Sequence, residues 1–130
     1  MLSRRSFMLA AIAANAASIT LAFAAETRTF DSSSFAAAQK AGKPILVAIH
    51  ASWCPTCAAQ RPILSELMIE PKFKDLVYFV VDFDTQKDTV KFFDARMQST
   101  LIAFKGTTET GRSVGDTERS PIAALLNKTL

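Results

Sequence analysis

The sequence is poor in the residues on which several classes of protein depend. Its 130 residues include two cysteines, one histidine, one tryptophan and four glycines. Two cysteines exclude a secreted scaffold held by several disulfides, and with one histidine they cannot complete a four-ligand zinc site unless carboxylates take part. A formal net charge of +3 is too small to indicate a nucleic-acid-binding protein. There is no glycine-rich nucleotide motif, so neither a nicotinamide nor a flavin cofactor is expected.

The remaining composition is that of a folded chain. Hydrophobic residues make up 49% of the sequence and charged residues 21%. Disordered chains have few apolar residues and a high net charge, and this chain has neither property. Its length suits a single domain.

The N-terminal segment is predicted to be a secretory signal peptide. Arg4 and Arg5 precede an apolar run that ends in Ala22-Phe23-Ala24, which matches the basic region, apolar region and small-residue cleavage site of such leaders. The arginine pair resembles a twin-arginine export signal. We therefore expect residues 1–24 to be the leader and residues 25–130 a mature domain in the periplasm or outside the cell. Because the apolar segment is barely long enough to span a bilayer, an uncleaved membrane anchor is the alternative.

The mature part alternates between strand and helix patterns. The predicted order is strand, helix, strand, helix, strand, helix, two strands forming a hairpin, and helix. The expected strands are 28–30, 45–49, 76–83, 100–104 and 112–114. The first expected helix is capped by one of residues 31–34 and stops at Gly42, and the other expected helices are 58–68, 84–93 and 120–128. Pro62 is expected to kink the second helix, and Ser120-Pro121 to begin the last. This order predicts an α/β fold with a mixed central sheet and helices on both faces.

Cys54 and Cys57 stand between a buried strand and a helix. Their spacing brings both sulfurs to one face of the first helical turn, where they can close a small disulfide ring. Because a helix N-terminus stabilises a thiolate, we expect Cys54 to be the nucleophile and the more buried Cys57 the resolving thiol. Trp53 is expected to cover the pair, Pro55 to fix the backbone within the ring, and Thr56 to add a hydroxyl beside the sulfurs.

Other interpretations of the pair stay open. A four-residue ring removes little entropy from the unfolded chain, so a purely structural disulfide is a poor staple. Alternatively, the two sulfurs are half of a metal site completed by His50 or a carboxylate, or hold a soft metal such as Cu(I) for delivery to a partner.

The ordered set of motifs resembles the thioredoxin family. The buried strand 45–49 leads into Trp53-Cys54-Pro55-Thr56-Cys57, and Pro62 follows Cys54 at the spacing of the family's helix-kinking proline. The resemblance continues through 80–84, 99–105 and 114–115. It implies a thioredoxin fold and thiol–disulfide exchange through a redox-active Cys54–Cys57 disulfide, with no other cofactor.

The chain departs from the family pattern at several positions. Pro55-Thr56 replaces the Gly-Pro of cytosolic thioredoxins, in the place where the family tunes its redox potential. Ser99-Thr100 stands where the family carries a cis-proline that shapes the substrate surface and keeps metal from the cysteines. Because a non-proline cis bond costs about 2.5–4 kcal/mol, we predict a trans Gln98–Ser99 peptide. Ala48 replaces the family's buried aspartate, and Val80 its accompanying lysine.

Several other residues have a functional and a simpler interpretation. His50 titrates in a range that suits a proton shuttle or thiolate partner, but the simpler interpretation is an idle, half-exposed strand end. Asp82 and Asp84 form a weak metal pair or merely end a strand at a polar loop, which is favoured. Arg61 is expected at the surface. The remaining expectations are a solvated helix face (Lys87, Lys91, Arg96) and core phenylalanines (Phe73, Phe79, Phe83, Phe92, Phe93, Phe104).

The sequence thus favours an exported thiol–disulfide oxidoreductase acting on protein thiols and disulfides. The absence of an inserted helical lid favours a reductase or electron carrier over an oxidase. A membrane dithiol donor or oxidant is the expected redox partner, and the protein is expected to be a monomer.

Overall fold

A computed structural model of the chain describes residues 16–17 and 25–130. The predicted signal peptide therefore lies outside the described residues, apart from residues 16–17. Among the helices of the described part, none has the length and apolar character needed to cross a membrane.

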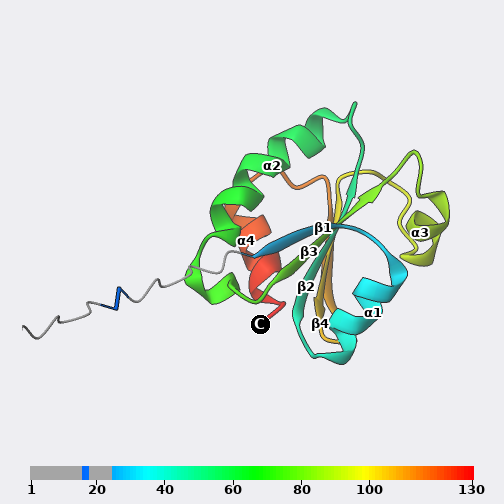
Figure 1. Cartoon of the computed structure of the whole chain (residues 1–130). Helices are drawn as coiled ribbons and strands as arrows, with labels where there is room; N and C mark the ends of the chain where they lie inside the picture. The colour runs from blue at the N-terminus through cyan, green and yellow to red at the C-terminus, as the bar shows by residue number, and fades with distance from the viewer. Residues whose placement is uncertain (1–15, 18–24) are drawn as a thin grey trace, which may run out of the picture.

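Nine of the elements follow the predicted order, with a short 3-10 turn, η1, added between the second helix and the third strand (Figure 1). The strands are β1 (Glu26–Thr29), β2 (Pro44–His50), β3 (Val77–Asp82), β4 (Thr100–Lys105) and β5 (Thr108–Val114). The helices are α1 (Ser32–Lys40), α2 (Pro55–Met68), η1 (Pro71–Phe73), α3 (Lys87–Phe92) and α4 (Arg119–Asn127).

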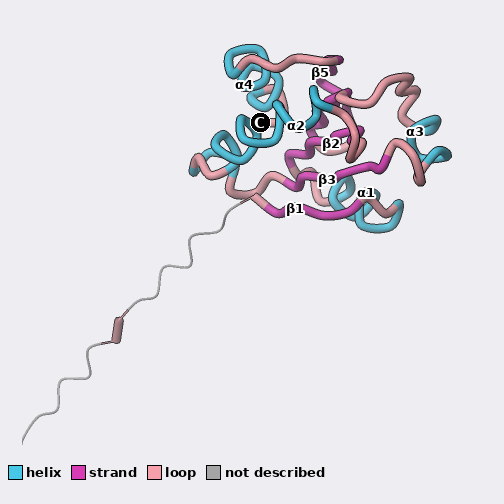
Figure 2. The backbone as a smooth tube through the Cα atoms, turned by 90° about the horizontal axis from the view of Figure 1, so that it is seen from above, coloured by secondary structure: helices cyan, strands magenta, loops and turns pink. Residues whose placement is uncertain are grey.

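The five strands form one mixed sheet in the order β1-β3-β2-β4-β5. β1, β3 and β2 run parallel, while β4 pairs antiparallel with both β2 and β5. Viewed from above, α1 and α3 lie on one side of the sheet and α2 and α4 on the other (Figure 2). The predicted fold class, a mixed sheet with helices on both faces, is confirmed.

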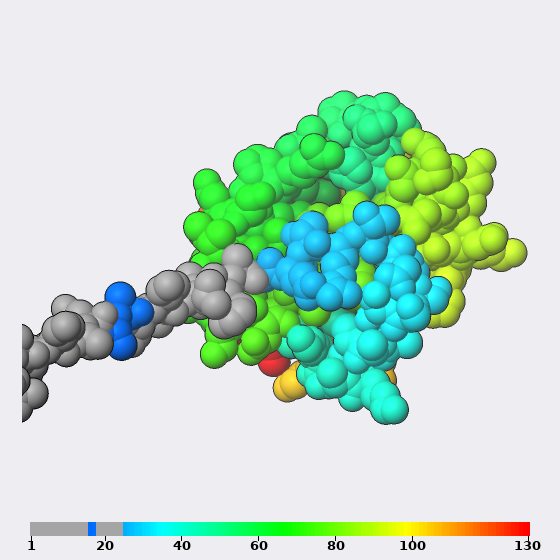
Figure 3. Space-filling model, in the orientation of Figure 1, coloured from blue at the N-terminus to red at the C-terminus, as the bar shows by residue number. Residues whose placement is uncertain are grey.

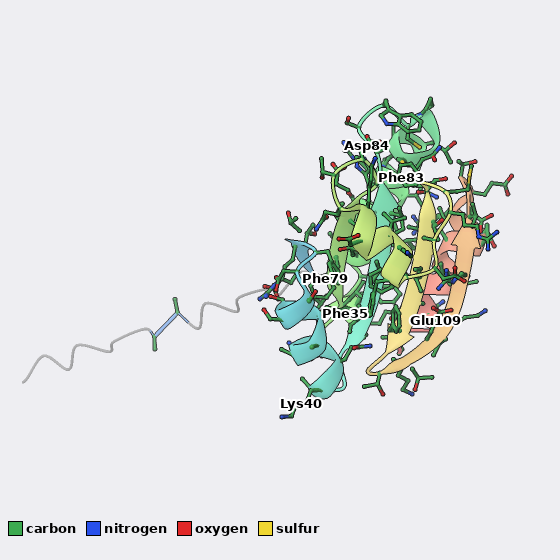
Figure 4. The ribbon with its side chains drawn as sticks, turned by 90° about the vertical axis from the view of Figure 1, so that its right-hand side faces the viewer. Phe35, Lys40, Phe79, Phe83, Asp84 and Glu109 are labelled. Carbon is green, nitrogen blue, oxygen red and sulfur yellow. The ribbon has the colours of Figure 1, made fainter. Side chains whose placement is uncertain are left out.

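The face under α1 and α3 is built largely from phenylalanine. Alternate residues of the central strand β2, namely Ile45, Val47 and Ile49, point to this side. The aromatic rings packed over them meet mostly edge to face at centroid distances of 5.3–6.1 Å. These rings belong to Phe30, Phe35, Phe79, Phe93 and Phe104, of which Phe35 and Phe79 are labelled in Figure 4.

The opposite face is aliphatic. Leu46 and Ala48 of β2 contact this second cluster, which α2 and α4 cover. Because β2 is covered on both sides, all five of its residues from Ile45 to Ile49 are buried, which explains the continuous apolar run in the sequence. β1, in contrast, is an edge strand whose four residues are all exposed, and it runs across the surface seen in Figure 3.

Phe92 contradicts the predicted core. Its side chain is 70% exposed, whereas the neighbouring Phe93 is buried. Adjacent residues of a helix end point in different directions, so Phe93 enters the aromatic cluster and Phe92 faces outward. Phe83 is only half-buried, and the other predicted phenylalanines are core residues.

Several predicted boundaries are also wrong. The hairpin turn is short, and β5 begins at Thr108 within the segment predicted to be a loop. Helix α3 begins at Lys87, because residues 83–85 form a turn. Helix α4 begins at Arg119 with Glu118 as N-cap, so Ser120 and Pro121 lie inside its first turn and Ser120 is not the cap. Helix α2 continues through Pro62 from Pro55 to Met68, and the expected kink at this proline stays a prediction.

Candidate active site

The two cysteines lie where β2 gives way to α2. Cys54 is the N-cap of the helix, with extended backbone angles, and Pro55 follows at its first position. The Cys57 backbone N–H donates a hydrogen bond of 3.1 Å to Cys54 Sγ, so the sulfur takes the place of an ordinary capping oxygen. A proline at the first helical position loses nothing, because its missing N–H would be unpaired there in any case.

Both thiols are free and buried to the same degree. Cys54 is 3% exposed and Cys57 2%. The prediction that Cys57 is the more buried of the two is therefore wrong. Burial raises the pKa of the Cys57 thiol, and the hydrogen bond with Cys54 raises it further. Backbone hydrogen bonding from Ala51 and Ser99 acts in the opposite direction and favours the Cys57 thiolate.

Trp53 forms an exposed aromatic wall beside the pair. Its side chain is 57% exposed, and its Nε1–H donates to Asp84 Oδ2 at 2.8 Å. Asp84 is carried there by the turn after β3 (Figure 4). Of the two residues between the cysteines, Pro55 is exposed and Thr56 half-buried.

The two aspartates at the end of β3 have separate structural partners. Asp82 Oδ1 accepts backbone N–H groups of Asp84 and Thr85, both at 2.9 Å. These hydrogen bonds lower the pKa of Asp82. Within residues 16–17 and 25–130, His, Cys, Asp and Glu form no group of three or more that could hold a metal ion. A metal at the cysteine pair would therefore rely on the two sulfurs.

His50 points to Arg61 of α2. The two side chains meet at 2.8 Å between His50 Nε2 and an Arg61 guanidinium nitrogen. Since arginine only donates, Nε2 accepts and the ring proton is on Nδ1. Partial burial lowers the pKa of His50 and the Arg61 charge lowers it further, while Asp82 raises it. Arg61 is at the surface as predicted.

The segment opposite the cysteines has an unusual backbone. The described residues contain no cis peptide bond, so the predicted trans Gln98–Ser99 bond is confirmed. Ser99 instead has φ of 62°, in the left-handed region, and its N–H donates to Ile49 O of β2 at 2.7 Å. Thr100 is buried, and its hydroxyl donates to Met97 O at 2.7 Å.

Gln60 is a buried polar residue near the cysteines that was not among the predicted site residues. This buried residue donates from Nε2 to the carbonyl oxygens of Ser99 and Asp116. A signal was available, because Gln60 occupies the same helix face as Cys57, Leu64 and Leu67, and a polar residue on a buried face needs partners. Ala48 of β2 pairs with Val80 of β3, so neither of these two positions supplies an ionisable side chain.

Comparisons with known proteins agree on one family. The thioredoxin family model matches residues 26–128. A thioredoxin H-type protein of Brassica campestris is 34% identical over 90 residues, which cover 69% of this chain and 72% of the relative. A thioredoxin of Mycobacterium bovis is 37% identical over 73 residues, or 56% of this chain and 62% of the relative.

Solved structures give the same result. The crystal structure of Trxlp from Edwardsiella tarda superimposes with a TM-score of 0.76 at 38% identity, covering 78% of this chain and 98% of that one. A thioredoxin of Malassezia sympodialis, at 19% identity and a TM-score of 0.69, shares the fold.

Proposed function

Because this chain belongs to the thioredoxin family and is a thiol–disulfide oxidoreductase, we propose that it is exported and works there as a reductase or electron carrier. Protein disulfides are its substrates, and a membrane dithiol supplies its electrons. The arginine pair and the Ala22-Phe23-Ala24 sequence of the leader support export. Disulfides persist in the compartments that such leaders reach, which gives a reductase substrates to act on.

The observation that carries this proposal is the capping of α2 by Cys54. The sulfur accepts the Cys57 N–H at the first turn of the helix, which places Cys54 as the attacking residue. The Cys54 thiolate attacks a substrate disulfide, forming a mixed disulfide and releasing one substrate thiolate. Cys57 then loses its proton and attacks Cys54 Sγ, which closes the Cys54–Cys57 disulfide and releases the second thiolate. Two electrons pass from the protein dithiol to the substrate.

The surface around the pair suits a polypeptide substrate. Three exposed apolar side chains, Trp53, Met97 and Val114, come from three separate segments. Val114 pairs with Thr100, and Gly115 N–H donates to Ser99 O, so these segments adjoin the residues opposite the cysteines. Exposed apolar groups around a reactive centre are typical of protein-binding sites.

The absence of a helical insertion in the described domain supports the proposed direction of electron flow. Between residues 25 and 130, the connections join the strands and helices directly, with no helical insertion over the cysteines. An oxidase with a dedicated lid would carry such an insertion. We therefore favour reduction, by a protein acting as a monomer. Soft-metal binding by the same two sulfurs is the alternative.

Trapping tests this proposal. The full-length chain with Cys57→Ser, expressed in a bacterium with a C-terminal tag, should accumulate mixed disulfides through Cys54 in the periplasmic fraction. A variant with both Cys54→Ser and Cys57→Ser is the control and should trap nothing. Replacing Arg4 and Arg5 by lysine should leave the protein in the cytoplasm. Retention of the wild-type chain in the cytoplasm contradicts export, and copper that copurifies stoichiometrically with the wild-type pair supports the alternative.

A further inference from the structure

A surface pocket lies between helix α2 and the face of the sheet that this helix covers. Its volume is about 270 Å³, and residues of β1, β2, β3 and α2 line it. Neither cysteine is among the lining residues, although Arg61, which lines the pocket, follows Cys57 by one helical turn. The pocket is therefore a neighbour of the reactive pair and not a part of it.

The polar side chains of the pocket are able to donate hydrogen bonds. Arg61 contributes guanidinium N–H groups, and Thr27, Ser65 and Tyr78 contribute hydroxyls. Within the described part of the chain, no aspartate or glutamate lines the pocket. Such a lining suits a ligand that accepts hydrogen bonds and carries negative charge.

Arg61 brings a positive charge that lacks an acidic partner. The ion pairs of residues 16–17 and 25–130 do not include it. Its guanidinium meets His50 Nε2 at 2.8 Å, which uses one of its five N–H donors. Glu26 and Glu66, which flank lining residues in the sequence, pair with other arginines. The remaining donors of Arg61 are thus open to a ligand.

The other titratable groups around Arg61 do not cancel its charge. Burial lowers the pKa of His50 and the Arg61 charge lowers it further, whereas Asp82, which pairs with His50 across β2 and β3, raises it. Burial raises the pKa of Tyr78 to about 12, so its hydroxyl keeps its proton. Asp82 does not line the pocket. At neutral pH, the pocket therefore presents one full positive charge and a neutral imidazole ring.

The rest of the lining is apolar. Leu64 and Met68 of α2 and Val80 of β3 form it. The volume is about nine times that of a water molecule in the liquid, so an inorganic ion on Arg61 would leave most of the pocket to water. A ligand that matches both parts has a carboxylate, which pairs with a guanidinium through two parallel hydrogen bonds, and a compact hydrocarbon part.

We propose that this pocket binds a small organic carboxylate, which pairs with Arg61 and lays its hydrocarbon part against Leu64 and Met68. The Tyr78 hydroxyl is a second donor to the carboxylate. This inference goes beyond thiol–disulfide exchange and does not depend on it, because the site uses neither sulfur.

His50 makes binding measurable, since it is the single histidine of the chain. The probe is benzoate, added to the purified protein at constant ionic strength, and the readout is the NMR signals of the His50 ring. We expect these signals to change to saturation. The pKa of His50 should rise in the complex, because the bound carboxylate offsets the nearby Arg61 charge.

Two compounds separate the parts of the ligand. Benzamide has nearly the shape of benzoate without its charge, and sulfate has the charge without a ring. Each should bind at least about tenfold more weakly than benzoate, because benzamide loses the charge-assisted hydrogen bonds and sulfate loses the apolar contacts.

Variants assign the binding to named residues. Arg61→Gln should weaken benzoate binding by at least about tenfold, the factor for one hydrogen bond to a charged group. Arg61→Lys keeps the charge without the planar fork and should fall between Arg61→Gln and the wild type. Tyr78→Phe removes only a hydroxyl and should weaken binding by roughly three- to tenfold, which gives a second test that leaves Arg61 in place.

Arg96→Gln is the matched control. Arg96 is also exposed and makes no ion pair among the described residues, but it lies between α3 and β4 and does not line the pocket. This variant changes the net charge by the same amount as Arg61→Gln and should bind benzoate as the wild type does.

The inference is wrong if benzoate causes no saturating change, or if benzamide or sulfate binds as tightly as benzoate. It is also wrong if Arg96→Gln weakens binding as much as Arg61→Gln, because the overall charge would then be responsible. Unchanged binding in both Arg61→Gln and Tyr78→Phe would place the carboxylate elsewhere and contradict it as well.

Discussion

At the scale of single residues, Ser99 combines a strained backbone with a place beside the cysteines. The left-handed region costs a non-glycine residue about 1–2 kcal/mol. We predict that Ser99→Gly raises the free energy of unfolding by roughly 0.5–1 kcal/mol, because relief of strain exceeds the extra entropy that glycine loses on folding. Urea unfolding of the reduced protein measures this change. The same substitution at the exposed helical Ser65 should instead cost about 0.5 kcal/mol.

His50 makes part of the stability depend on pH. Its pKa is lower in the folded protein than in the unfolded chain, through burial and the Arg61 charge, so the unfolded chain binds a proton more readily. The stability contribution is present above about pH 6.5, the usual histidine pKa, and is lost as the pH falls through the folded value. Gln in place of His50 should flatten the loss of stability between about pH 7 and pH 5. The prediction is wrong if the free energy of unfolding changes with pH in the same way for wild type and His50→Gln.

Trp53 is the single tryptophan of the chain, so its fluorescence measures the mobility of the side chain beside the cysteines. Asp84→Ala removes the acceptor of its indole N–H, so the side chain should become more mobile. We predict a lower steady-state fluorescence anisotropy for this variant, with Asp84→Asn, which keeps an oxygen acceptor, close to wild type. Equal anisotropy in all three proteins would show that the hydrogen bond does not hold Trp53.

The geometry of the cysteine pair could be predicted from the sequence. The hydrogen bonds from Gln60 to the Ser99 and Asp116 carbonyls could not. Cys54, Cys57 and the helix they begin lie within a few residues of one another, so local pattern determines their geometry. The partners of Gln60, Ser99 and Asp116, are 39 and 56 residues away. Contacts of that kind depend on how the loops pack, which periodicity along the chain does not encode.

At the scale of elements, strand β5 shows where periodicity fails. Its first four residues, 108–111, are polar or glycine, so the sequence indicates a loop there and a strand only from Arg112 onward. Its order comes from backbone pairing with β4, in which Lys105 faces Thr108 at the turn. Strand β2 was predicted correctly, because helices cover both of its faces. A strand buried on both sides has a continuous apolar run, which the sequence shows directly.

Close packing of β5 against α4 gives a prediction at this scale. A Cβ atom on Gly111 would lie 2.9 Å from Leu125 Cδ1 and 3.0 Å from Lys128 Cδ. Since Leu125 is buried, Gly111→Ala should push the helix outward and cost roughly 1–3 kcal/mol of unfolding free energy.

A double-mutant cycle checks the cause. Leu125→Ala removes the atom that the new methyl group would meet, so Gly111→Ala should cost less in that background than in the wild type. Equal costs in both backgrounds would show that the overlap with Leu125 is not responsible.

At the scale of the whole molecule, the hydrophobic core and the reactive cysteines occupy different parts of the fold. The core lies between the sheet and the two helix layers, while Phe83, Asp84 and the start of α2 lie at one end and Lys40 at the other (Figure 4). The site is therefore assembled from loops that a rigid sheet positions. This arrangement leaves the sulfurs, Trp53 and the Ser99 segment together at one edge, where a partner protein can approach.

The reduction potential of the Cys54–Cys57 pair tests the central claim most directly. The domain of residues 25–130 would be equilibrated against dithiothreitol or glutathione buffers, and the fraction of dithiol read by alkylation. A reductase supplied by a membrane dithiol predicts a potential near that of thioredoxin, about −270 mV. A value near about −120 mV, typical of a dithiol oxidase, or a pair that never equilibrates with the buffer, would contradict the account.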